Sequence, residues 1–264
     1  MHLRRILVSF AISILSSLSA LAKPIKIGVI AGPSVQVLAV AQKVAKEKYN
    51  LDLQPVIFTN YMMPNEALNT NDIYMNIFQT VSFLKQAVVK RGYNIVSIGN
   101  TYIYPMGVYS KKISSLSQLK NNSTVAIPND SSNQGRALLL LSQAGLLKLK
   151  SSAGEFATVE DILSNPKHLK VTTLDSSQLP RVVSDVDAVV LNNDFVARAG
   201  FQPEQSLVHE NPNTAQSYIN ILVVNSNEKD NKELKEVVKV MHSKEVVEKN
   251  LELFPGAIQA WHGS

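Results

Sequence analysis

The sequence contains no cysteine, so its 264 residues can form no disulfide and offer no lipid-bearing N-terminal cysteine. Beyond residue 22 it also lacks an apolar run long enough to span a bilayer as a helix. A domain of this length can bury a sufficient core without covalent staples. We therefore expect a soluble mature chain.

Motifs of catalytic, nucleotide and metal sites are also missing. No Gly-x-Ser-x-Gly elbow, dinucleotide fingerprint or Gly-Lys-Ser/Thr phosphate loop occurs. His168, His209, His242 and His262 lie in separate segments without zinc spacing or an adjacent nucleophile motif. We expect no catalytic residue, no metal site and no cofactor, and hence a protein that is not an enzyme.

The charge pattern argues against nucleic acid. The formal charge is +5, but the 26 basic residues less Arg4 and Arg5 leave 24 against 21 acidic ones, or +3. These charges are interspersed, with no basic stripe and no aromatic RNA-binding motif. We expect no nucleic-acid partner.

Residues 1–22 have the parts of a secretory signal peptide. Basic Arg4 and Arg5 precede an apolar run from Ile6 to about Leu21, and a small residue, Ala22, precedes Lys23. We predict cleavage after Ala22, the alternative being a retained anchor. With no cysteine to carry lipid, the protein is expected to diffuse freely in the periplasm.

The remaining chain alternates strand-like and helix-like segments, which predicts a parallel α/β architecture. Residues 25–30, 35–49 and 51–58 form a strand, a helix and a strand, as in a βαβ unit. Residues 93–98 and 102–109 are predicted as two strands, the second interrupted by Pro and Gly as suits a crossing between lobes. Residues 158–163 are predicted as a short capped helix.

Counting these units predicts two similar α/β halves. Residues 23–105 form the first lobe and residues 106–215 the second. The remainder, 216–264, is expected to return to the first lobe. The pattern is typical of a two-lobed clamp.

The stretch from Val125 to Leu141 reads as a buried strand, a polar loop and the start of an apolar helix. Arg136 lies just inside that helix, where a cation opposes the helix dipole. It therefore calls for an anionic partner, either a ligand carboxylate held bidentately or an internal acidic side chain such as Asp130. Tyr61 and Phe78 fall at strand-to-helix junctions, where each could line a pocket or belong to the core.

Motifs distributed in order along nearly the whole mature chain resemble those of the NlpA family, methionine-binding, lipoprotein-type periplasmic proteins that serve an ABC importer. The motifs are Ile27-Gly-Val-Ile-Ala-Gly-Pro33, Asn76-Ile-Phe-Gln79, Gly99-Asn-Thr-Tyr-Ile-Tyr-Pro105, Tyr109-Ser-Lys-Lys112, Pro128-Asn-Asp130, Asn133-Gln-Gly-Arg136, Leu179-Pro-Arg181 and Gly256-Ala-Ile-Gln-Ala-Trp261.

This resemblance implies a type II periplasmic binding fold, in which the ligand lies in a cleft between two lobes, each a sheet flanked by helices. It assigns the carboxylate clamp to Arg136, supported by Asn133. Asn192 and Asn220 match positions that contact the ligand's ammonium or carboxylate. Tyr61 and Phe78 match the aromatic wall around the methionine side chain, which suits a thioether.

The chain departs from the family pattern at two positions of that wall. Family members have His and Tyr where this sequence has Thr80 and Phe83. Both changes remove a polar group that could touch the ligand, so the pocket is expected either to take a different or modified amino acid or to bind methionine through a rearranged polar network.

We therefore predict a monomeric binding protein that delivers the amino acid methionine to an inner-membrane ABC permease. The alternatives are a binder of another small amino acid or short peptide, and a surface or interaction protein on the same fold that transports nothing.

Overall fold

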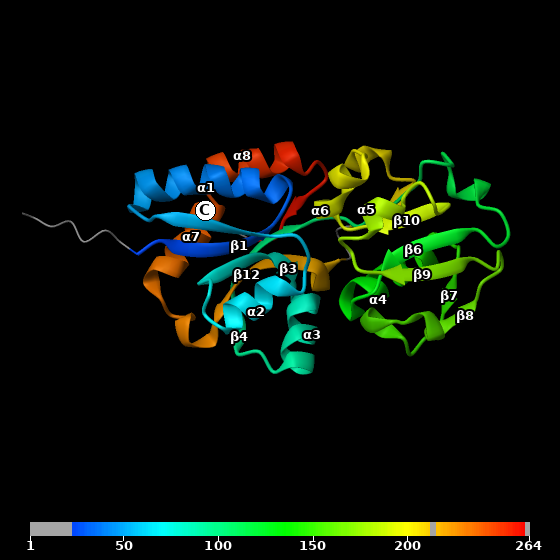
Figure 1. The fold of residues 1–264 in the computed structure, drawn as a ribbon, viewed down its shortest axis with the longest axis horizontal. Helices are drawn as coiled ribbons and strands as arrows, with labels where there is room; N and C mark the ends of the chain where they lie inside the picture. The colour runs from blue at the N-terminus through cyan, green and yellow to red at the C-terminus, as the bar shows by residue number, and fades with distance from the viewer. Residues whose placement is uncertain (1–22, 212–214, 262–264) are drawn as a thin grey trace, which may run out of the picture.

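The computed structural model describes residues 23–211 and 215–261. They form two lobes that lie side by side along the long axis of the molecule (Figure 1). Each lobe has its own sheet, and the C-terminal helices return to the lobe that contains the first strands. Among the described residues, none of the helices has the length and apolar character that a membrane span requires.

The first lobe contains a six-stranded sheet in the order β13-β4-β12-β3-β1-β2. Its strands are β1 (Ile25–Ile30), β2 (Leu53–Phe58), β3 (Met75–Thr80), β4 (Ile95–Ile103), β12 (Ile219–Asn225) and β13 (Ile258–Gln259). Its helices are α1 (Pro33–Tyr49), α2 (Met63–Asn69), α3 (Val81–Arg91), α7 (Lys232–Met241) and α8 (Lys244–Leu253). We call it the six-stranded lobe.

The second lobe contains a five-stranded sheet in the order β11-β5-β10-β6-β9. Its strands are β5 (Gly107–Tyr109), β6 (Thr124–Pro128), β9 (Lys170–Leu174), β10 (Ala188–Leu191) and β11 (Val208–His209). Helices α4 (Ser131–Gln143), α5 (Leu179–Val182) and α6 (Asn193–Val196), with the small hairpin of β7 (Lys148–Leu149) and β8 (Ile162–Ser164), complete it. We call it the five-stranded lobe.

Both sheets are mixed, which corrects the expectation of a parallel architecture. β2, β1 and β3 are parallel, as are β9, β6 and β10. The strands next to the crossings, β4, β12 and β5, pair antiparallel because the chain enters and leaves each lobe there. The predicted βαβ unit at the N-terminus is confirmed as β1, α1 and β2.

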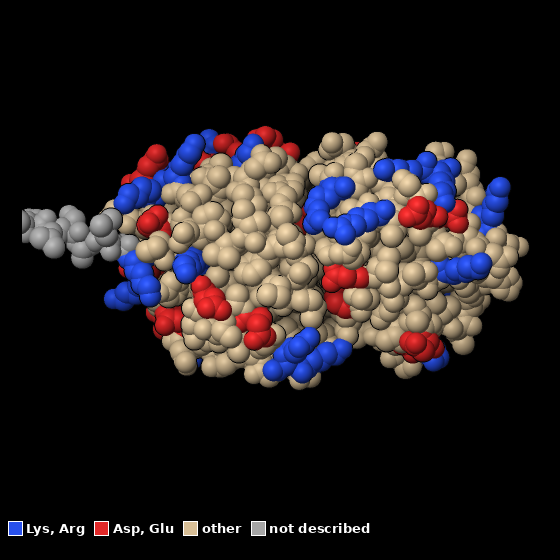
Figure 2. Space-filling model, viewed as in Figure 1, with Lys and Arg blue, Asp and Glu red and all other residues tan. Residues whose placement is uncertain are grey.

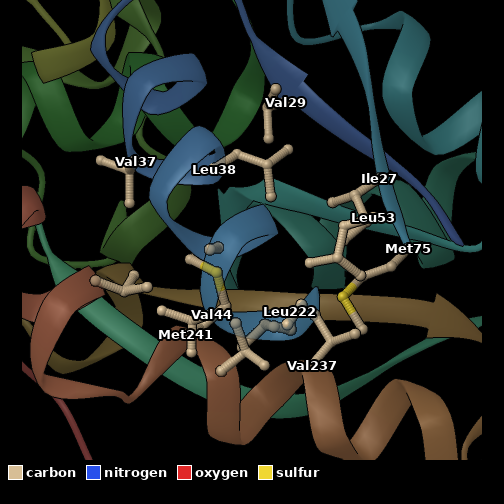
Figure 3. Packing of buried hydrophobic residues seen from close by; sticks show 14 of the residues in the cluster. Ile27, Val29, Val37, Leu38, Val44, Leu53, Met75, Leu222, Val237 and Met241 are labelled. Atoms are coloured by element: carbon tan, nitrogen blue, oxygen red, sulfur yellow. The ribbon is translucent and has the colours of Figure 1, made fainter. Parts of the chain in front are cut away.

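Helix α1 shows how the sequence sets an element of the core. Pro33 begins it, since proline suits the first helical turn, and Asn50 ends it in the left-handed conformation. Its buried face includes Leu38 and Val44, which lie against the sheet beside Val29 while α7 closes the other side (Figure 3). Burying such side chains contributes about 1.5–3 kcal/mol each.

The chain crosses between the lobes twice. The first crossing is residues 104–106, between β4 and β5, and the second connects β11 to β12 and includes the described residues 210, 211 and 215–218. The sequence suggested the first crossing but divided the strands wrongly, because β4 continues through Gly99 to Ile103. Residues 158–163 also differ: Thr158 caps only a 3₁₀ turn, after which β8 begins at Ile162.

Charged side chains cover both lobes without forming a single-sign field on the face shown in Figure 2. Lys and Arg alternate with Asp and Glu there, and a mostly uncharged surface lies between them. The deepest charged groups belong to the junction between the lobes, where the candidate site lies.

Candidate ligand-binding site

A cavity of about 30 Å³ lies between the lobes. Both lobes and the first crossing contribute to its lining. The residues that the sequence singled out all line it: Tyr61, Phe78, Thr80, Phe83, Asn133, Arg136, Asn192 and Asn220. The structure therefore brings together side chains from segments as far apart in sequence as the loop before α2 and strand β12, whereas their roles toward a ligand remain predictions.

Three aromatic rings of the six-stranded lobe form one wall. Tyr61 lies 5.7 Å from Phe78 and 6.0 Å from Phe83 between ring centroids, and Phe78 and Phe83 are 5.6 Å apart. Phe195 of the five-stranded lobe closes the cluster at 5.2 Å from Tyr61. Edge-to-face and tilted pairs of this kind make a rigid apolar surface. The ring of Phe83 makes the contacts within this wall, so the packing does not need the hydroxyl that a tyrosine would have at this position.

Thr80 has a structural task at the same wall. Its Oγ1 accepts a hydrogen bond of 3.1 Å from the backbone N–H of Phe83 and thereby caps the N-terminus of α3. Threonine is a favourable cap because it satisfies a helical N–H that has no partner within the helix. Thr80 thus fixes the entry of the helix that carries Phe83.

A chain of amides crosses the floor of the cavity in the five-stranded lobe. Asp130 caps α4 by accepting from the N–H of Asn133 at 2.9 Å, and the Asn133 side chain donates back to both Asp130 oxygens. Asn192 Nδ2 then donates to Asn133 Oδ1 at 2.8 Å. Burial raises the pKa of the Asp130 carboxyl, and the hydrogen bonds from Asn133 oppose this rise. Asn133 and Asn192 are therefore oriented by a helix cap.

One hydrogen-bond acceptor among these amides has no donor. Asn192 Oδ1 is buried, and the described residues offer it no hydrogen-bond donor. A buried carbonyl without a donor is costly unless water or a ligand supplies one. The side chain of Asn220, from β12 of the other lobe, lines the same cavity.

Arg136 has an internal acidic partner, Glu210. Arg136 Nε donates to Glu210 Oε1 at 2.8 Å and Nη2 donates to Oε2 at 2.6 Å, with the two side chains 3% and 8% exposed. Nη2 also donates to the carbonyl of Tyr104, and the ring of Tyr218 lies 4.4 Å from the guanidinium carbon. The internal acidic partner of Arg136 is therefore Glu210 and not Asp130, and the contact of Arg136 with a ligand carboxylate stays a prediction.

The sequence reading missed several members of the lining, namely Gln79, Tyr104, Asn193 and Asp194, together with Glu210 behind Arg136. Gln79 stands in the quoted Asn76–Gln79 motif, and Asp194 follows β10 directly, so the rule that ligands gather beyond strand ends applied to both. Glu210 carried no such signal, because it lies in a loop 74 residues from its partner.

Asp194 connects the two lobes across the cavity. It lies in α6, and its carboxylate accepts from the Tyr61 hydroxyl at 2.8 Å and from the Ser34 hydroxyl at 3.2 Å, both in the six-stranded lobe. Burial raises the pKa of Asp194, while these two hydrogen bonds lower it. Burial and the neighbouring Asp194 charge raise the pKa of Tyr61 well above its usual value, so the phenol remains a donor.

The arrangement is one of binding groups: an apolar aromatic wall faces amides and charged side chains. Among the described residues, no cluster of three or more His, Asp or Glu side chains could hold a metal ion. What the cavity can do chemically is enclose a small ligand that has both an apolar part and polar ends.

Known proteins support this interpretation. D-methionine-binding lipoprotein MetQ of Escherichia coli K12 is 43% identical over 90% of this chain and 88% of its own length. A Burkholderia cenocepacia nutrient-binding protein solved with methionine is 45% identical, with a TM-score of 0.86 over 90% of this chain and all of its own. An ABC transporter periplasmic substrate-binding protein from Coxiella burnetii is 43% identical, with a TM-score of 0.86 over 89% of this chain and all of its own.

These names correct the predicted localisation. We expected a freely diffusing periplasmic protein without lipid, but the curated relatives are lipoproteins. The expectation rested on the missing cysteine and on residues 1–22, which lie outside the described residues. A signal-like N-terminus precedes lipidated and unlipidated chains alike, so it could not carry the conclusion.

The sequence pattern of one family covers almost every described residue. The NlpA lipoprotein family matches residues 25–261, from the first strand to beyond β13. The match includes both lobes, both crossings and all the residues that line the cavity. The chain belongs to the NlpA lipoprotein family.

Proposed function

We propose that this protein is the substrate-binding component of an ABC importer and that its ligand is methionine. The observation that carries the proposal is the interlobe cavity in which an aromatic wall faces Arg136 and the amides of Asn133, Asn192 and Asn220. Its relatives of similar sequence and structure include proteins that bind methionine and a component of an ABC transporter.

The lining suits the two ends of a methionine molecule. Tyr61, Phe78 and Phe83 form a polarisable apolar wall, and a thioether gains from contact with aromatic rings. Nη1 of Arg136 is the guanidinium nitrogen that remains for a carboxylate once Glu210 has taken Nε and Nη2. The Thr80 and Phe83 departures leave the wall apolar, as a thioether requires.

In this proposal residues 23–105 with 216–264 form one lobe and residues 106–215 the other, and the ligand stabilises their closed arrangement. The protein works as a monomer that presents its closed form to a membrane permease. It binds and releases its ligand unchanged, without catalysis, cofactor or nucleic acid.

Calorimetry on protein refolded without ligand tests the proposal. L- and D-methionine should bind and raise the melting temperature, because a ligand that binds only the folded state stabilises it by mass action. Norleucine, which replaces the sulfur by a methylene, is the matched control and should bind more weakly. If neither L- nor D-methionine binds, the proposal is wrong.

A further inference from the structure

The charges of the cavity do not balance. Arg136 is neutralised by Glu210, which leaves the carboxylate of Asp194 as an excess negative charge in the lining. Among residues 23–211 and 215–261, its partners are the neutral hydroxyls of Tyr61 and Ser34, and it forms no ion pair. Asp194 is partly buried, and a carboxylate removed from water is normally paired with a cation, since burial otherwise disfavours its charge.

A second acceptor without a donor belongs to the same segment. Asn192 Oδ1 is buried and unpartnered within the described chain, while Asn192 Nδ2 is already committed to Asn133. Asn192 and Asp194 stand two positions apart at the start of α6, directly after β10, and both line the cavity. The lining therefore offers acceptors and negative charge where a donor and positive charge are missing.

An ammonium group supplies what is missing. It carries three donors and one positive charge, and a carboxylate that accepts two hydroxyl hydrogen bonds still has lone pairs to accept more. We propose that Asp194, together with Asn192 Oδ1, binds the α-ammonium of the ligand and restricts the site to ligands with a free amine. This inference rests on the proposed function and names the group that selects within it.

The selection has a simple electrostatic reason. A ligand with a carboxylate but no amine would add a negative charge to a cavity in which Glu210 already pairs with Arg136 and Asp194 has no cation. Like charges enclosed together repel more strongly than in water. An amine relieves the repulsion, and burial makes its pairing with Asp194 stronger than a surface pairing.

The test compares three ligands of one carbon skeleton on wild type and on Asp194→Asn. The ligands are L-methionine, 4-(methylthio)butanoate, which lacks the amine, and 3-(methylthio)propylamine, which lacks the carboxylate. Asparagine keeps the shape and can still accept from the Tyr61 hydroxyl. In the variant, methionine and the propylamine should each lose about 30-fold or more in affinity. The butanoate should bind the variant as tightly as wild type, or more tightly.

A role limited to joining the lobes predicts something else, because weaker closure would lower the affinity of all three ligands by the same factor. That outcome would overturn the inference. The matched control is Asp175→Asn, which removes one charge from the five-stranded lobe outside the cavity lining. Its affinities for the three ligands should stay within threefold of wild type.

Wild type gives a second test that needs no variant. It should bind methionine at least tenfold more tightly than the butanoate. If it binds the two equally, the inference fails while the proposed function stands. If it binds none of the three ligands, the proposed function fails and the inference with it.

Discussion

Single side chains at the lobe junction differ in how much they contribute to stability. The Arg136–Glu210 pair is almost fully buried, so neither side chain has bulk water as an alternative partner. In the exposed pair Lys239–Glu236, Nζ and Oε1 are 2.9 Å apart. Both side chains contact water in the folded and in the unfolded chain, so the pair contributes little to stability. Removing one partner of a buried pair leaves the other charge uncompensated. The resulting loss of stability is larger than the net stabilisation that the intact pair provides.

Glu210→Gln should accordingly lower the free energy of unfolding by about 3–5 kcal/mol at neutral pH, measured by urea denaturation. Glu236→Gln breaks the exposed pair and should change it by less than about 1 kcal/mol. Equal effects of the two substitutions would show that Arg136 finds another partner in the unpaired state.

At the scale of elements, a network of buried amides joins α2 to β3 beneath the aromatic wall. Asn65 is its centre: Nδ2 donates to Gln79 Oε1 at 2.9 Å, and Oδ1 accepts from Asn76 at 2.9 Å and from Gln79 at 2.6 Å. The Asn76–Gln79 motif is thus explained by packing, because it satisfies the polar groups under the strand that carries Phe78 and Thr80.

Asn65→Ala should destabilise the protein by about 1–3 kcal/mol, as measured by urea unfolding, because Gln79 Oε1 loses its donor while Asn76 Nδ2 and Gln79 Nε2 keep other acceptors. It should also weaken methionine binding, since Gln79 lines the cavity. Glu66→Ala is the control on the same helix. It removes an exposed hydrogen bond from Tyr93, so its effect should remain below about 1 kcal/mol. A similar loss in both variants would contradict the central role of Asn65.

The elements show which features could be predicted from sequence. Helix α1 follows the 3.6-residue period of its apolar residues, so its prediction over residues 35–49 agrees to within two residues with Pro33–Tyr49. The predicted strand over residues 93–98 ended before Gly99, which lies inside β4 at a position where a Cβ would be 2.7 Å from Val238 on α7. The cavity lining followed from strand ends and family motifs, whereas Glu210 and the Asp194 contacts depend on how the lobes meet, which no local pattern records.

The whole molecule is held in its present arrangement partly by contacts that cross the cavity. Tyr61 and Ser34 bind Asp194, and Phe195 packs with Tyr61 and Phe78. In the proposed hinge motion, we expect such contacts to stabilise the closed state and to be lost when the lobes separate. Their strength sets how far the ligand-free protein opens.

Tyr61→Phe removes the hydroxyl but keeps the ring. Because a hydrogen bond to a charged group contributes about 1.5–3 kcal/mol, the ligand-free variant should populate the open form more and bind methionine at least tenfold more weakly. Small-angle scattering should give it a larger radius of gyration than ligand-free wild type. Tyr93→Phe, which loses a hydrogen bond within the six-stranded lobe alone, should scatter as wild type does. An unchanged radius for Tyr61→Phe would exclude this contact as a determinant of closure.

The place of Arg136 relative to the crossings has a mechanical consequence. Arg136 donates to the Tyr104 carbonyl in the first crossing, and Glu210, in the second, accepts from the N–H of Met106 at 2.8 Å. In the proposed hinge motion, the pair therefore lies at the hinge, where the lobes move least. The contact between Asp194 and Tyr61, in contrast, forms only when the two lobes meet. We expect the carboxylate to dock on a nearly stationary cation in the open form and the amine to be checked only at the last degrees of rotation. We therefore expect carboxylate binding at Arg136 and selection for the amine at Asp194 to be successive steps of one closing motion.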